Sequence, residues 1–166
     1  MEFNDGKRLR CEDPLVADAL GRLLGPLARE LIFDAPLGSL LEHDLTGHVA
    51  VTAALGPLYL ADLLEARPLA LIAGCPSVDR LTELVRGIGD RPKPVYHGPP
   101  LGRLPLTRSE RRLLRDYVLA DSLEAAARQL GIKKKTAANR LSLVKEKLGV
   151  KTHGQLLRVY FEGFEG

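Results

Sequence analysis

The sequence contains no tryptophan, only four tyrosines and four phenylalanines, and a single methionine. A core must therefore be built from aliphatic side chains, which a hydrophobic content of 45% can supply. No apolar run approaches the roughly 20 residues that a membrane-spanning helix requires. The polar start MEFNDGKRLRCED does not resemble a secretory signal. We therefore expect a cytoplasmic protein with no membrane partner.

Groups that usually carry catalytic or metal chemistry are also scarce. Cys11 and Cys75 form no C-x-x-C motif, and the histidines at positions 43, 48, 97 and 153 have no metal-ligand spacing. The chain contains no nucleophile elbow and no glycine-rich phosphate loop. Cys75 follows an expected strand and is interpreted as a small buried residue. We expect no catalytic residue, no metal, no cofactor, and a protein that is not an enzyme.

The charge is distributed unevenly along the chain. Residues 1–100 contain 10 Lys/Arg and 14 Asp/Glu, a net charge of −4, whereas residues 101–166 contain 14 and 7, a net charge of +7. Between the two halves lies RPKPVYHGPPLGRLP, whose five prolines are typical of a linker. This pattern predicts two domains, 1–100 and 101–166, and a polyanionic partner for the second.

The first hundred residues favour an α/β domain. A helix is expected to start at Asp13-Pro14 and to run through LVADALGRLLGPLARELIF, with a kink at Pro26. Strand-like segments at 48–53, at 70–74 and in KPVYHG then alternate with two helix-like segments. This β-α-β-α-β order predicts a small parallel sheet with helices packed against it.

The C-terminal part predicts four short helices with clear start signals. Capping-box pairs open the first, second and fourth, at Thr107/Glu110, Asp121/Glu124 and Thr152/Gln155. The third is expected over 134–148, between the turn at Gly131 and the stop at Gly149. The domain is therefore predicted to be all-α.

The third helix has one apolar side and one polar side. Projection at 100° per residue gathers Ala137, Leu141, Val144 and Leu148 on an inward face. The opposite face carries Lys135, Asn139, Ser142 and Glu146, with Ala138 and Lys145 on one flank and Arg140 and Lys147 on the other. Short residues let a helix enter a major groove, where Asn pairs with adenine and Ser with several base edges. Lysines at the start of the helix, Lys133, Lys134 and Lys135, would meet phosphates there.

These residues also carry a resemblance to a known family. Residues 104–160 resemble, without gaps, the LuxR/GerE-type helix-turn-helix domain of bacterial transcription regulators. The likeness covers the opening Leu-Thr-x-x-Glu-Arg, the Ala-x-x-Leu-x-Ile of the scaffold helix and turn, Thr136, and Lys-Leu-Gly-Val at 147–150. It implies a transcription regulator that binds double-stranded DNA through its third helix.

The resemblance also assigns roles to individual positions. It implies base contacts by Ala138, Asn139 and Ser142, and backbone contacts by Thr136, Lys145 and Lys147. It implies a homodimer formed by the fourth helix through Leu156, Val159 and Tyr160, and hence two half-sites with two-fold symmetry.

Other interpretations remain open. NRLSLVKEKL also resembles the DNA-binding region four of sigma factors, which contact RNA polymerase, and the fold could serve as a protein-interaction module that has lost DNA recognition. The first domain invites comparison with a receiver domain, but Ala73, Gly74 and Cys75 stand where the phosphoacceptor Asp would be. We therefore expect a receiver-like or unrelated sensing domain that responds to a regulatory protein or a ligand and not to phosphorylation.

Overall fold

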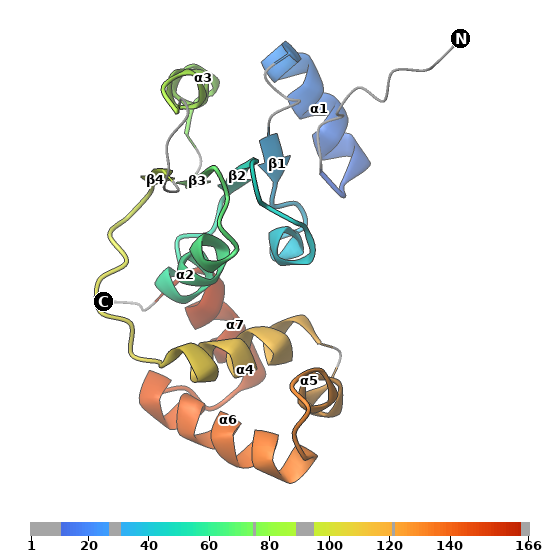
Figure 1. Cartoon of the computed structure of the whole chain (residues 1–166), viewed down its shortest axis with the longest axis vertical. Coiled ribbons are helices and arrows are strands. Elements are labelled where there is room, and N and C mark those ends of the chain that lie inside the picture. The colour runs from blue at the N-terminus through green and yellow to red at the C-terminus, as the bar shows by residue number, and fades with distance from the viewer. Residues whose placement is uncertain (1–10, 27–30, 75, 89–94, 121, 164–166) are drawn as a thin grey trace. The chain divides into compact units, whose positions relative to one another are not determined.

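The computed structural model describes residues 11–26, 31–74, 76–88, 95–120 and 122–163 (Figure 1). The chain divides into two compact units. The N-terminal unit comprises residues 1–54 and 63–99, and the C-terminal unit comprises 55–62 and 100–166. This division differs from the expected one chiefly because residues 55–62 group with the C-terminal helices, and its later boundary lies one residue earlier, after residue 99.

A small parallel sheet forms the centre of the N-terminal unit. Its strands are β1 (Leu31–Phe33), β2 (Val49–Thr52), β3 (Ala70–Ala73) and β4 (Val95–His97), in the order β1-β2-β3-β4. All three pairings are parallel. The expected α/β character and the three expected strands are therefore present. A receiver domain has the strand order 2-1-3-4-5, so the sheet order here is different.

The start of the chain corrects one prediction. Helix α1 covers Pro14–Leu24 and is capped by Asp13, whose Oδ1 accepts hydrogen bonds from the amides of Leu15 and Val16. It ends at Gly25, where φ is +54°. The expected continuation through Leu31–Phe33 is wrong, because these residues are buried and pair with β2 as strand β1. Residues 27–30 lie outside the described residues.

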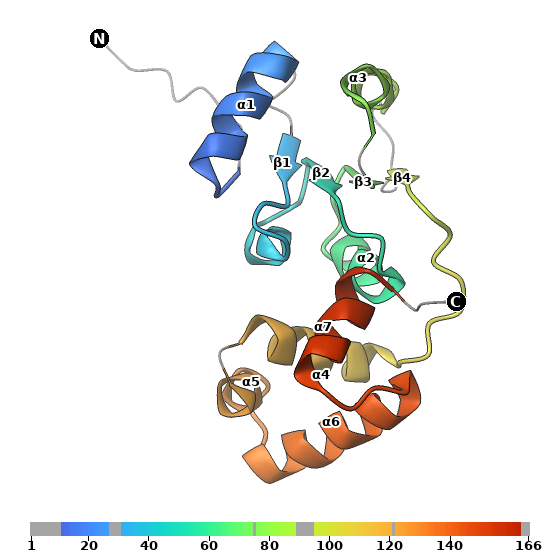
Figure 2. The ribbon, with the colours of Figure 1, turned by 180° about the vertical axis from the view of Figure 1, so that it is seen from behind.

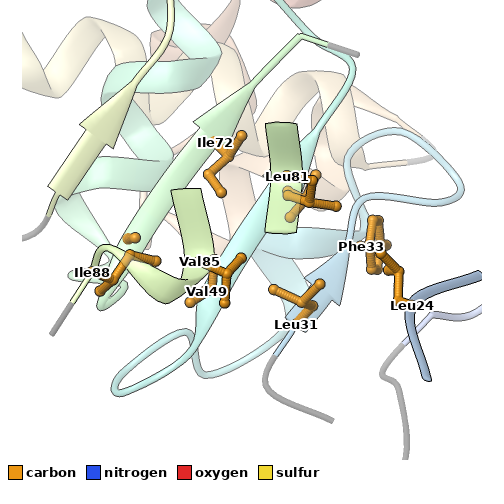
Figure 3. Packing of buried hydrophobic residues seen from close by; sticks show 10 residues of the cluster. Leu24, Leu31, Phe33, Val49, Ile72, Leu81, Val85 and Ile88 are labelled. Atoms are coloured by element: carbon orange, nitrogen blue, oxygen red, sulfur yellow. The ribbon is translucent and has the colours of Figure 1, made fainter. Parts of the chain in front are cut away.

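One side of the sheet carries a hydrophobic core. Helix α3 (Val78–Arg86), capped by Ser77, and the end of α1 bring aliphatic side chains onto it, as Figure 3 shows. A short 3-10 helix, η2 (Ser39–Glu42), follows β1. The buried cluster comprises Leu24, Leu31, Phe33, Val49, Val51, Ala70, Ile72, Leu81, Val85 and Ile88.

The C-terminal unit is helical. It contains α4 (Arg108–Leu119), α5 (Leu123–Gln129), α6 (Lys134–Leu148) and α7 (His153–Phe161), and α4, α5 and α6 pack on one another (Figure 2). The capping boxes of α4 and α7 are both formed. Helix α5 is capped by Ser122, one residue after the expected Asp121, which lies outside the described residues. Residues 55–62 add the start of α2 (Pro57–Glu65) to this unit.

Candidate functional site

Helix α6 has the bounds and the orientation that the sequence predicts. Its apolar stripe faces inward, since Ala137 and Val144 are fully buried and Leu141 and Leu148 are nearly so. The helix stops at Gly149, whose φ of +67° suits a residue without a side chain. A short turn with Gly131 at φ +65° connects it to α5. The turn is fixed by a hydrogen bond from the Ile132 amide to the Ala127 carbonyl.

The outward side of α6 is a polar surface of mostly short residues. Lys135, Asn139, Ser142 and Glu146 are exposed, and Ala138 is half-buried beside them. The Ser142 hydroxyl donates to the Ala138 carbonyl at 3.1 Å, which fixes its rotamer and leaves its oxygen able to accept. The residues predicted to contact bases, Ala138, Asn139 and Ser142, therefore lie together on one accessible face of α6.

The three lysines at the start of α6 have different environments. Lys133 is the N-cap residue and makes no side-chain capping bond. Lys134 pairs with Glu124 of α5, with 3.2 Å between Nζ and Oε2. Lys133 and Lys135 form no salt bridge with any residue in the described ranges. Positive charge at a helix N-terminus is unfavourable, and Glu124 offsets it at one of the three positions.

The other end of α6 is tied to α4. The Lys147 ammonium donates to Glu110 at 2.6 Å, and Glu110 also closes the capping box of α4 with Thr107. The hydrogen bond from Lys147, with that from the Thr107 backbone, lowers the pKa of Glu110. Lys145, on the opposite flank, donates to the Lys151 carbonyl at 3.3 Å. Both lysines are thus held by hydrogen bonds within the chain.

A hollow of about 360 Å³ adjoins this flank between α4 and α6. Arg140 lines it, is exposed, and is the remaining predicted cation of the helix. Leu143 also lines the hollow and is 55% exposed. Thr136 is half-buried one turn before Arg140. The N-cap residue of α4 and three residues of the helix complete the lining: Thr107, Ser109, Glu110 and Leu113.

Helix α7 departs from the expectation of a dimerisation surface. Leu156 and Tyr160 are fully buried within the chain, and Val159 is half-buried. The side chains of two of the three predicted dimerisation residues are therefore not accessible to a second chain. Residues 55–62 lie against the end of α7, since the ring centroids of Tyr59 and Tyr160 are 5.5 Å apart and the amides of Leu55 and Gly56 both donate to the Phe161 carbonyl.

A buried polar network holds this packing together. The Tyr160 hydroxyl donates to Oδ2 of Asp62 at 2.7 Å, and Nε of Arg111 donates to Oδ1 at 3.2 Å. All three residues are buried, with exposed fractions of 0%, 3% and 8% for Tyr160, Asp62 and Arg111. Burial raises the pKa of Asp62, and the hydrogen bonds from Tyr160 and Arg111 offset part of that rise. Burial, reinforced by the adjacent Asp62 carboxylate, raises the pKa of Tyr160 well above its ordinary value.

No local sequence pattern reveals this network. Its members lie 49 and 98 residues apart, so no local pattern connects them. One signal was available, because Asp62 interrupts the apolar run LYLADLL, where a charged residue is buried only with a partner.

In the N-terminal unit, a second polar pair lies at the carboxyl ends of the strands. The Thr52 hydroxyl donates to Oδ2 of buried Asp34 at 2.6 Å, and the amides of Gly38 and Leu40 donate to Oδ1. A largely aliphatic cavity of about 200 Å³ adjoins the pair, between α1 and α3. At the end of β3, where a receiver domain would have its phosphoacceptor Asp, this chain has Ala73 and Gly74. Cys75 lies outside the described residues.

Among the described residues, no group of three His, Cys, Asp or Glu side chains could hold a metal ion. None of the helices in the described ranges has the length and apolar character needed to span a membrane.

No protein-family model matches the chain, and a comparison with curated proteins found no match. A functional assignment therefore depends on the residues of α6 and on what surrounds them.

Proposed function

We propose that the protein is a sequence-specific DNA-binding transcription regulator whose C-terminal unit contains a helix-turn-helix, with α5 as the scaffold helix and α6 as the recognition helix. The observation that carries this proposal is the outward face of α6, where short polar side chains stand between two cationic flanks. The resemblance of residues 104–160 to the LuxR/GerE type supports the same assignment.

The centre of this face suits the reading of base edges. Asn139 can make a bidentate pair with adenine, and Ser142 can bond to several bases. The Ala138 methyl can pack on a thymine methyl, and Glu146 can accept from the amino group of cytosine. Because these side chains are short or flexible, the helix axis can come close to the floor of a major groove.

The cations around the face suit phosphate binding. Lys133, Lys135 and Arg140 are exposed, and Lys145 flanks the reading residues. Lys134 and Lys147 also lie on the helix, although each is bonded to a glutamate in the chain. Phosphates would compete with these exposed carboxylates, since exposed ion pairs contribute only about 0–1 kcal/mol. The net charge of +7 on residues 101–166 favours the same partner.

The proposal is tested by selecting bound duplexes from a randomised pool with the full-length protein and measuring their affinity across a salt series. Asn139→Ala is expected to relax selection at one base position and to cost about 1–3 kcal/mol on the preferred site. Lys135→Ala is expected to weaken all sequences alike and to reduce the slope of log K against log salt by about 0.9. Arg86→Ala is the control, because Arg86 is an exposed cation of α3 in the other unit.

Each outcome discriminates between the functions that the sequence leaves open. A selected motif that Asn139→Ala relaxes supports sequence-specific binding. Retention of RNA polymerase core by the protein would support a sigma-like factor instead. Failure to retain any duplex at low salt would refute DNA binding and favour a protein-interaction module, for which the exposed Leu143 beside its hollow would be the first surface to test.

A further inference from the structure

Helix α1 has apolar residues on two sides, and only one side is covered. Leu20 and Leu24 face the core of the N-terminal unit. Leu15, Ala19 and Leu23 follow one another at intervals of four residues and form a second stripe, which we call the outer stripe. Leu15 is 82% exposed and Leu23 is 63% exposed. Large aliphatic side chains exposed in a row on one helix face are typical of an interaction surface.

The outer stripe is bordered by one acidic and one basic residue on the same flank. Asp18 and Arg22 each precede a stripe residue, so both lie on the same side of it. Their side chains form a salt bridge of 2.9 Å and are 62% and 79% exposed. Asp18 and Arg22 are therefore accessible to another molecule, although they are paired with each other within the helix.

We propose that the outer stripe is a homodimer interface, in which α1 packs antiparallel against α1 of a second copy of this chain. Two-fold symmetry between antiparallel helices brings the same flank of each helix together. With the axis near residues 19–20, Leu15 lies opposite Leu23 of the second copy, and Asp18 lies opposite Arg22 of the second copy. The apolar pairing centres the axis on residue 19 and the charged pairing on residue 20, about 1.5 Å apart along the helix, so one register serves both.

The alternative arrangement lacks this match. In a parallel pair, the charged flank of one helix meets the opposite flank of the other, which carries Val16 and Leu20. These residues are directed toward the unit's own core and offer no charge to Asp18 or Arg22. The stripe is therefore complementary to itself in the antiparallel sense, which identifies a second copy as its partner.

The size of the surface sets the expected strength of the dimer. Helix α1 has 11 residues and is about 16 Å long, so the stripe is small beside the roughly 800 Å² per partner of a stable interface. The dimer is therefore weak in free solution. The role of the dimer rests on the proposed function, since two half-sites on one DNA would raise the effective concentration of the two copies.

The charge pairing gives the first test, by sedimentation velocity of the full-length protein without DNA. Asp18→Arg and Arg22→Asp should each raise the dimer dissociation constant about threefold to tenfold, because each places like charges opposite one another. A mixture of the two variants should recover association, and so should the double variant, because both restore opposite charges. A dissociation constant that is unchanged in the single variants, or a mixture that does not recover, would refute the register.

The apolar stripe gives the second test. Leu15→Glu with Leu23→Glu should raise the dissociation constant more than tenfold, and both positions are exposed enough for the fold to survive, as circular dichroism would check. Ala19→Cys, in a Cys11→Ser and Cys75→Ser background, should form a disulfide-linked dimer on oxidation, because Ala19 lies near the two-fold axis. Arg86→Cys on α3 is the control that should not. A wild-type protein that remains monomeric at all concentrations and gives no Ala19→Cys cross-link overturns the proposal.

DNA measurements keep this inference separate from the proposed function. The Leu15→Glu, Leu23→Glu variant should bind a single half-site as well as the wild type and lose only the advantage that a second half-site confers. If neither protein binds a half-site, the proposed function fails while the dimer interface is still decided by sedimentation. If both bind paired half-sites equally well, the interface fails while DNA binding stands.

Discussion

Removal of the Asp62 carboxylate should destabilise the C-terminal unit more than most single substitutions. In Asp62→Ala, the buried Arg111 guanidinium loses its carboxylate partner at 3.2 Å and the Tyr160 hydroxyl loses its acceptor at 2.7 Å. Breaking a buried ion pair by removing one partner costs about 3–5 kcal/mol. Whole domains are stable by only about 5–15 kcal/mol. We therefore expect the free energy of unfolding to fall by about 3–5 kcal/mol.

Two further variants separate the contribution of the Tyr160 hydrogen bond from that of the buried ion pair. Tyr160→Phe removes one hydrogen bond to a charged group and should cost about 1.5–3 kcal/mol. Replacing the ion pair by apolar residues, in Asp62→Leu with Arg111→Met, should recover at least half of the loss, because the buried charge of Arg111 is removed together with the carboxylate that it binds. The order of stability is then wild type, the apolar double variant, and Asp62→Ala.

The assay is urea unfolding at about pH 7, followed by circular dichroism and by hydrogen exchange of the α7 amides. Glu83→Ala is the matched control, because the Arg80–Glu83 salt bridge, at 3.0 Å, is about as short as the 3.2 Å Arg111–Asp62 pair, but both of its side chains are mostly exposed. Its loss should cost no more than about 1 kcal/mol. A cost below about 1 kcal/mol for Asp62→Ala, equal to the control, would refute the view that this network fixes α7.

Three further predictions concern the same unit. Glu110→Gln keeps the capping box and removes the carboxylate charge that Lys147 binds. The pKa of Glu110 is lowered on folding, first by the hydrogen bond from Lys147, so its contribution to stability is present above its ordinary pKa and is lost as the pH falls through the folded pKa. The stability difference from wild type, measured in urea titrations, should therefore shrink as the pH falls below the ordinary range of a carboxylate. Gly56→Ala should cost about 1–3 kcal/mol in the same assay, because the new methyl would lie 2.7 Å from the carbonyl carbon of Phe161. Gly154→Ala is the control: its methyl meets no atom within 4 Å, so the substitution should be neutral or stabilising. The isolated fragment 101–166 should melt at a lower temperature than the C-terminal unit in the whole chain, because it lacks residues 55–62; equal melting temperatures would contradict this.

The sequence predicts those parts of the fold that local signals determine. The bounds of α6 follow from a turn glycine, a 3.6-residue period and Gly149, and the structure has the same bounds. The capping boxes at Thr107 and Thr152 are formed for the same reason, since their hydrogen bonds join residues three apart. These features need no knowledge of the rest of the chain.

Features that depend on distant residues could not be predicted in this way. Leu31–Phe33 is a short apolar run that periodicity cannot distinguish from a helix segment, and pairing with β2 decides that it is a strand. The place of residues 55–62 depends on contacts with Phe161, about one hundred positions later. The burial of Asp62 is visible only when Arg111 and Tyr160 are beside it.

The burial of α7 bears on how two copies could associate. A dimer formed through Tyr160 and Leu156 would have to displace residues 55–62 and leave Asp62 and Arg111 without their present environment. Disruption of such a buried pair costs about 3–5 kcal/mol in each copy, which corresponds to a factor of roughly 10²–10⁴ in affinity before any new contact forms. The outer stripe of α1 requires no such rearrangement, since Leu15 and Leu23 are already exposed. Association through α1 would therefore leave α7 and its buried network within its own chain.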